Sequence, residues 1–91
     1  MSKKRERLQV IHDILQVVKD KNGRIKPTHI LYKSNLSHQM MDEYLTELLE
    51  KGFIIENKNE EGKTYSITTK GQEYLIKYKL IVDFTTSFGL N

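Results

Sequence analysis

The segment between Lys33 and Ile55 constrains the fold of this 91-residue chain most strongly. After the polar pair Ser34-Asn35, apolar residues recur at helical spacing, at Met41, Leu45, Leu48 and Leu49. Ser37 precedes this helix and is placed to cap it by accepting hydrogen bonds from the exposed amides of the first turn. Gly52 stands where a residue with positive φ would end the helix, and the apolar run after it favours a strand. The sequence therefore predicts a turn, a capped amphipathic helix and a strand in direct succession.

Two further helices are predicted before this segment. The first has one buried face, which is indicated by the spacing of Leu8, Ile11, Ile14, Leu15, Val17 and Val18. Asn22-Gly23 ends it, and Arg24 to Lys26 is short enough for either a single edge strand or an extended link. Pro27 suits the first position of a short second helix that continues to Lys33.

A hairpin and a last helix are predicted after the segment. Phe53 to Asn57 forms one strand, Lys58 to Gly62 forms a polar loop, and Lys63 to Ile67 alternates in polarity as a hairpin strand does. Thr68 or Thr69 then caps the last helix. Its apolar residues cover more than one face: Tyr74, Leu75, Tyr78, Leu80, Ile81, Val82, Phe84 and Phe88.

The net charge of +3 is distributed unevenly along the chain. Residues 1–33 hold nine Lys and Arg against three acids, residues 34–61 hold two against seven, and residues 62–91 hold four against two. This pattern predicts a basic first helix, an acidic middle and a basic end. The basic run from Lys3 to Arg7 is either a solvated terminus or an arm that contacts phosphates.

Several functional classes are disfavoured by composition. The chain has no cysteine, which excludes a disulfide scaffold and a thiolate metal site. Its charged start is unlike a secretory signal, and the apolar stretch from Tyr74 to Phe88 is too short and too charged to span a bilayer. His12, His29 and His38 fall on three separate helices without metal-ligand spacing. We therefore expect a soluble cytoplasmic protein with no membrane contact, no metal and no cofactor.

Catalytic patterns are missing as well. The sequence contains no Gly-rich phosphate loop, no nucleophile elbow and no Cys/His combination. A domain of this size rarely encloses a catalytic pocket. The chain is therefore interpreted as a non-enzyme.

The order of elements resembles the winged helix-turn-helix family, and most closely the small archaeal dimeric DNA-binding proteins whose C-terminal helix forms an antiparallel coiled coil. Segments 30–37, 44–54 and 65–71 carry this resemblance, which covers nearly the whole length. It implies a mainly helical α+β fold, with a winged helix-turn-helix over residues 1–68 and a long dimerisation helix over residues 69–91 of one structural unit.

The resemblance also implies roles for individual residues. In the family, the N-terminal half of the third helix enters the major groove, the hairpin or wing touches backbone or minor groove, and the last helix pairs two subunits. The positions carried over as DNA-binding are Thr28, Lys33, Ser37, His38, Gln39, Glu43, Lys58 and Lys63, with Asp42 also facing the groove. The positions carried over as the dimer interface are Tyr74, Leu75, Tyr78, Ile81, Val82 and Phe84.

Each of these roles has a plainer alternative. Gln39 would pair bidentately with adenine and His38 would reach a phosphate or a guanine, or both are ordinary surface residues of an amphipathic helix. Lys58 and Lys63 would touch phosphate, or they keep the hairpin soluble and protect its edge. The apolar stripes of the last helix would meet a second subunit, or they pack only within the domain.

We therefore expect a homodimer that binds double-stranded DNA, as a transcriptional regulator or a small chromatin-associated protein. The third helix is unusual because it offers carboxylates where base-reading helices normally present Arg, Lys, Gln or Asn. The alternative hypothesis is an interaction module that uses Asp42, Glu43 and Glu47 to bind a basic protein partner without DNA.

Overall fold

The computed structural model describes residues 6–90 and shows a mainly helical α+β fold. The described elements, in chain order, are α1 (Arg7–Asp20), α2 (Pro27–Ser34), α3 (His38–Glu50), β1 (Ile54–Asn59), β2 (Gly62–Ile67) and α4 (Thr69–Ser87). The fold class predicted from the sequence is thus confirmed. Most of the basic run predicted as a terminus or arm, at Lys3 to Arg7, lies outside the described residues.

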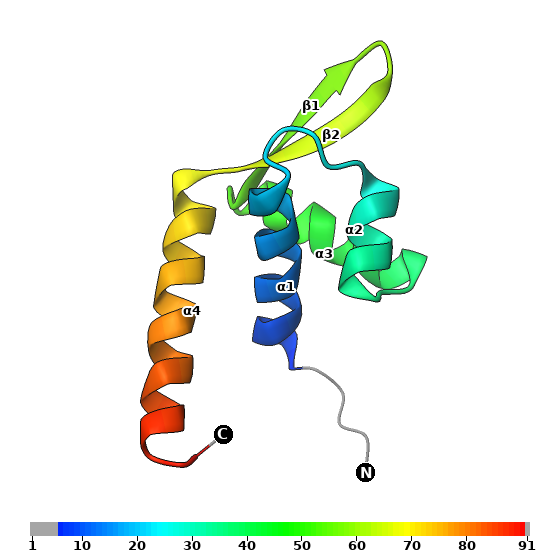
Figure 1. Cartoon of the computed structure of the whole chain (residues 1–91). Helices are drawn as coiled ribbons and strands as arrows, with labels where there is room; N and C mark the ends of the chain where they lie inside the picture. Colours follow the sequence, from blue (N-terminus) through cyan, green and yellow to red (C-terminus); the bar gives the residue numbers. More distant parts are fainter. Residues whose placement is uncertain (1–5, 91) are drawn as a thin grey trace.

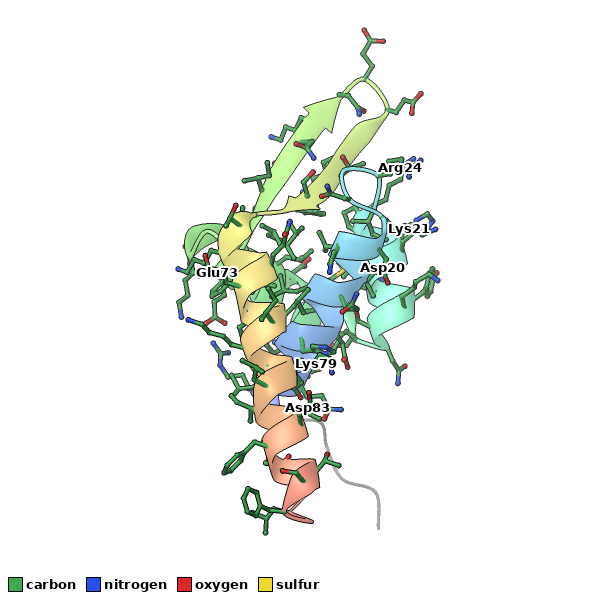
Figure 2. All side chains as sticks on the ribbon, turned by 60° about the vertical axis from the view of Figure 1, so that its left-hand side comes forward. Asp20, Lys21, Arg24, Glu73, Lys79 and Asp83 are labelled. Carbon is green, nitrogen blue, oxygen red and sulfur yellow. The ribbon has the colours of Figure 1, made fainter. Side chains whose placement is uncertain are left out.

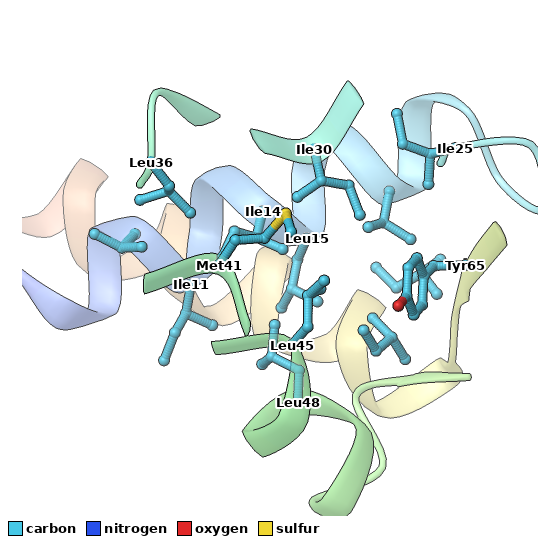
Figure 3. Close-up of a cluster of buried hydrophobic side chains, with 14 of the residues drawn as sticks. Ile11, Ile14, Leu15, Ile25, Ile30, Leu36, Met41, Leu45, Leu48 and Tyr65 are labelled. Atoms are coloured by element: carbon cyan, nitrogen blue, oxygen red, sulfur yellow. The ribbon is translucent and has the colours of Figure 1, made fainter. Parts of the chain in front are cut away.

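The helix α1 occupies the centre of the molecule (Figure 1). The helix α4 runs antiparallel beside it, α2 and α3 cover its other sides, and the β1–β2 hairpin projects from one end as the wing. The largest wholly buried side chains come from all of these layers except α4: Ile14, Leu15, Val18, Ile25, Ile30, Leu48 and Ile54. Figure 3 shows this cluster closing around α1. Each such side chain contributes roughly 1.5–3 kcal/mol of hydrophobic stabilisation.

Local signals set the ends of α3. The hydroxyl of Ser37 accepts a hydrogen bond from the amide of Met40 at 3.2 Å, as predicted for a capping residue. Asn35 adopts a left-handed conformation (φ 55°) in the turn before it. Gly52, at φ 78°, takes the positive φ predicted for it just after the helix.

The wing is longer and its turn tighter than predicted. Cross-strand pairing runs from Ile54 opposite Ile67 to Asn59 opposite Gly62, so Glu60 and Glu61 alone form the turn. Both predicted ends of the loop over residues 58–62 were therefore wrong, because the strands extend to Asn59 and start again at Gly62. The side chain of Asn59 accepts from the amide of Glu61 at 2.9 Å, which holds this turn closed.

The segment between α1 and α2 pairs with the wing through a single bridge. The amide of Tyr65 donates to the carbonyl of Ile25 at 3.1 Å, and the amide of Gly23 donates to the carbonyl of Tyr65 at 3.0 Å. Residues 24–26 thus form an extended link with one β-bridge at Ile25, and not a full edge strand. The bridge ties the base of the wing to the core.

The helix α4 packs on the domain with its first half only. Thr68, rather than Thr69, caps it by accepting from the amide of Gly71 at 3.2 Å. Leu75 is buried, and the Tyr74 hydroxyl donates to the carbonyl of Leu8 at 2.6 Å. Beyond this half the apolar side chains of α4 are exposed, because α4 is five residues longer than α1 and continues past the end of α1.

Candidate nucleic-acid interface

The predicted base-reading residues all lie on the exposed N-terminal half of α3. His38, Gln39 and Glu43 are exposed, and the hydroxyl of Ser37 is engaged in capping. The Gln39 amide nitrogen lies 3.5 Å from a carboxylate oxygen of Glu43, one turn further on. Its donor group therefore points to a carboxylate of its own helix, which competes with any base edge for the same hydrogen bond.

Carboxylates dominate the rest of the α3 surface. Glu47 is compensated, since it accepts from Arg7 and from Lys51, the latter at 2.7 Å. These hydrogen bonds, first from Arg7 and then from Lys51, lower the pKa of Glu47 to about 2. Asp42 and Glu43 form no ion pair within residues 6–90. The face expected to meet the major groove is therefore negative at two exposed positions.

The wing lysines share a single carboxylate. The ammonium nitrogens of Lys58 and Lys63 lie 3.7 and 3.8 Å from the carboxylate oxygens of Glu56, and the two lysines are cross-strand partners. With Glu60 and Glu61 at the turn, the outer wing holds two positive and three negative charges. The sequence suggested the lysines as phosphate contacts, but this pairing appears only once the register is known.

The residues predicted on α2 lie beside a group of cations that sequence reasoning did not single out. Thr28 and Lys33 are both exposed, at opposite ends of this helix. Lys33 lines a surface hollow of about 400 Å³ together with Asp20, Lys21, Arg24 and His29. The signal available from sequence was the excess of Lys and Arg in residues 1–33.

The residues predicted for the dimer interface divide between two faces of α4. Leu75 is only 7% exposed and belongs to the core, and Tyr74 and Tyr78 pack towards α1, where Tyr78 stacks on His12 with ring centroids 4.5 Å apart. Ile81, Val82 and Phe84 are exposed. The exposed face also includes three side chains that the predicted interface omitted: Ile76, Leu80 and Phe88.

A second hollow, of about 520 Å³, lies between α1 and α4. Its lining mixes apolar side chains with His12, Asp13, Lys79 and Asp83. The ammonium nitrogen of Lys79 lies 3.1 Å from a carboxylate oxygen of Asp83. Nδ1 of His12 lies 3.1 Å from a carboxylate oxygen of Asp13. Among the described residues, no group of three His, Cys, Asp or Glu side chains is arranged to hold a metal ion.

Within residues 6–90, no helix combines the length and the apolar character needed to cross a bilayer. The remaining features, a helical core around α1, a turn into an exposed α3 and a two-stranded wing, define a class of protein. The chain belongs to the winged helix-turn-helix family, whose sequence model matches residues 4–85.

Three other proteins are similar to this chain in sequence or in fold. The uncharacterized protein MJ0290 of Methanocaldococcus jannaschii is 36% identical over 76 residues, which are 84% of this chain and 33% of that protein. The chain thus spans one third of that relative's length. The DNA-binding protein Sso10a-2 of Sulfolobus solfataricus has a similar fold, with a TM-score of 0.78 at 19% identity, over 92% of this chain and 85% of that one.

The third is MepR of S. aureus, whose structure was solved in complex with DNA. It matches with a TM-score of 0.69 at 16% identity, over 86% of this chain and 58% of that one. At these identities, the two solved structures show a shared fold.

Proposed function

We propose that this protein binds double-stranded DNA as a homodimer and acts as a transcriptional regulator or a small chromatin-associated protein. The observation that carries the proposal is the winged helix-turn-helix itself, with an exposed α3 and wing and with a cationic surface at the junction of α1 and α2. Two proteins with this fold support it, because Sso10a-2 is described as DNA-binding and MepR was solved with DNA.

The exposed face of α4 supports the homodimer. Ile76, Leu80 and Phe84 recur every four residues and are 63%, 62% and 60% exposed, so they form one apolar stripe. Monomeric proteins rarely expose a contiguous apolar stripe of this kind. An antiparallel pair of α4 helices that crosses at Leu80 would place Ile76 of one copy opposite Phe84 of the other.

A two-fold dimer also presents two α3 helices and two wings. Half-sites about 34 Å apart would then meet successive turns on one side of a duplex.

Fluorescence anisotropy of a labelled random-sequence duplex, measured at two salt concentrations, tests the DNA-binding part. We expect micromolar or tighter binding that falls steeply as salt rises, because phosphate contacts release counterions. Absence of binding at low salt would refute it.

Light scattering tests the dimer. We expect a dimer mass for the wild-type protein and a monomer mass for Leu80→Glu, which places a carboxylate at the crossing point. Lys79→Gln is the control because Lys79 is the adjacent residue but faces the hollow between α1 and α4, and glutamine adds no second carboxylate beside Asp83. A monomer mass for the wild-type protein at micromolar concentration would refute the dimer.

A second candidate function is favoured by the uncompensated charges of Asp42 and Glu43 on α3. In that case the acidic face binds a basic protein segment and the chain does not bind DNA. Wild-type protein that does not bind DNA but binds a labelled lysine-rich peptide would support this candidate. The double substitution Asp42→Asn and Glu43→Gln should then abolish peptide binding.

A further inference from the structure

The cations of this protein differ in whether a carboxylate compensates them. Lys58 and Lys63 lie near Glu56, Arg7 and Lys51 bind Glu47, and Lys79 binds Asp83. In contrast, seven exposed cations form no ion pair within residues 6–90. Lys19, Lys70 and Lys77 are dispersed over α1 and α4, whereas four gather where α1 meets α2: Lys21, Arg24, Lys26 and Lys33. These four, with His29, are here called the basic corner.

The basic corner is one continuous surface. Lys21 and Arg24 follow α1, Lys26 immediately precedes α2, and His29 and Lys33 lie on α2. Four of these five residues line the hollow of about 400 Å³ at the junction of α1 and α2. Figure 2 shows Lys21 and Arg24 projecting on the same side of the molecule, away from α4.

One carboxylate adjoins this surface. Asp20 lines the hollow as well, and it accepts a hydrogen bond from the side chain of Gln16 at 3.0 Å. It therefore faces back along α1 towards its own helix, and the positive charges of the basic corner outnumber it.

The bridge between Ile25 and Tyr65 connects the basic corner to the wing. Ile25 is fully buried, so its neighbours Arg24 and Lys26 point to the opposite, solvent side, as alternate residues of an extended chain do. Since the bridge is antiparallel, Lys26 lies opposite Thr64, one residue before Tyr65 on β2. The basic corner thus adjoins the base of the wing, while the lysines of the outer wing lie near Glu56.

We propose that the basic corner is the main phosphate-binding surface of this protein, and that a duplex lies across the corner and the base of the wing at the Ile25–Tyr65 bridge, with α3 only at its margin. The proposal rests on the proposed DNA-binding function and specifies where the duplex docks. Asp42 and Glu43 would repel phosphates if α3 sat deep in the major groove, whereas the corner offers unpaired cations to the same phosphates. Binding dominated by such contacts carries little sequence information.

The decisive comparison uses two double variants that each remove two positive charges. Lys21→Gln with Arg24→Gln removes half of the unpaired cations of the corner, while Lys58→Gln with Lys63→Gln removes the wing pair that shares Glu56. All four side chains are exposed, so we expect unchanged melting temperatures, which circular dichroism checks first.

Salt titrations of duplex binding by anisotropy then provide the readout. Each phosphate contact contributes about 0.9 to the slope of log affinity against log salt, so the corner variant should lose about 1.8 from the slope and roughly 50-fold in affinity at about 0.1 M salt. The wing variant should lose less, because Glu56 already compensates part of its charge.

The outcomes separate the docking proposal from the function. If the wild-type protein binds and the corner variant binds with the same slope, the corner is not the docking surface and the proposal is overturned while DNA binding stands. An equal or larger loss in the wing variant also overturns it. If the wild-type protein does not bind at low salt, the DNA-binding function fails and the docking proposal fails with it.

A further pair of substitutions on α3 tests the marginal position of that helix. Asp42→Asn with Glu43→Gln should raise affinity by less than about 10-fold if the duplex lies across the corner, since one phosphate contact is worth about that much at about 0.1 M salt. A larger gain, or a new preference for one base at a defined position, would place α3 inside the groove and overturn the proposal.

Discussion

Gly71→Ala is expected to destabilise the protein, although alanine is the better helix former. Gly71 lies in the first turn of α4, where helix propensity alone would favour alanine by about 1 kcal/mol. A Cβ at this position would overlap the carbonyl oxygen of Phe53 and lie 2.6 Å from Cγ1 of Ile67. The Phe53 carbonyl is held in place because it accepts from both the amide and the hydroxyl of Thr68, at 3.1 and 2.9 Å.

Relief of the overlap requires α4 to move away from the end of the wing, or these hydrogen bonds to break. Overpacking costs about 1–3 kcal/mol, and the upper end applies here because the obstructing atom is fixed backbone. After the gain in helix propensity, the net loss is roughly 2 kcal/mol. In a domain of this size that lowers the melting temperature by about 8–16 °C.

Urea denaturation followed by circular dichroism at one fixed protein concentration measures this loss. Gln72→Ala is the matched control, because Gln72 is the next residue of α4 and is exposed. Its stability should stay within about 0.5 kcal/mol of the wild-type value. A Gly71→Ala protein that is as stable as wild type, or more stable, would show that the close approach has been overestimated and that propensity decides at this position.

Three other predictions concern stability. Tyr74→Phe should cost about 1 kcal/mol at neutral pH through loss of the bond to the Leu8 carbonyl. Burial raises the pKa of Tyr74 to about 12, so the wild-type protein should lose stability as pH rises from 10 towards 12, and the variant should lose less in urea titrations over that range. Because Arg7 first and Lys51 second lower the pKa of Glu47 to about 2, its stabilisation should be complete above pH 4.5 and fade as pH falls towards 2, and Glu47→Gln should flatten this acid limb of the urea midpoint. Ser37→Ala should cost about 1 kcal/mol in urea, with Ser37→Asp retaining most of the stability; equal losses in both would contradict the capping role.

The parts of the fold that depend on local chemistry could be predicted from the sequence. Ser37 and Gly52 bound α3 through hydrogen bonding and backbone conformation within a few residues, and both predictions are confirmed. The predicted bounds of the wing turn were wrong because Asn59 and Gly62 are cross-strand partners. Strand pairing extends a strand beyond its apolar residues. Likewise, only packing determines that Leu75 faces the core while Leu80 faces solvent.

The charges of the candidate interface were harder to predict from the sequence, because they are compensated by residues that lie apart in the chain. Arg7 binds Glu47 from 40 residues away, and Lys63 reaches Glu56 across the hairpin. Residue types alone do not distinguish such cations from the unpaired Lys21 and Arg24. The DNA contacts and dimer contacts assigned to single residues by resemblance stay predictions.

The bridge between Ile25 and Tyr65 has a consequence for the thermodynamics of ligand binding. A two-stranded hairpin is marginally stable in water by itself and would sample many orientations. The bridge adds a third backbone segment at its base, so the orientation of the wing is already restricted when the chain folds. A ligand that contacts the wing then immobilises little further chain, and its association should carry a small conformational entropy penalty.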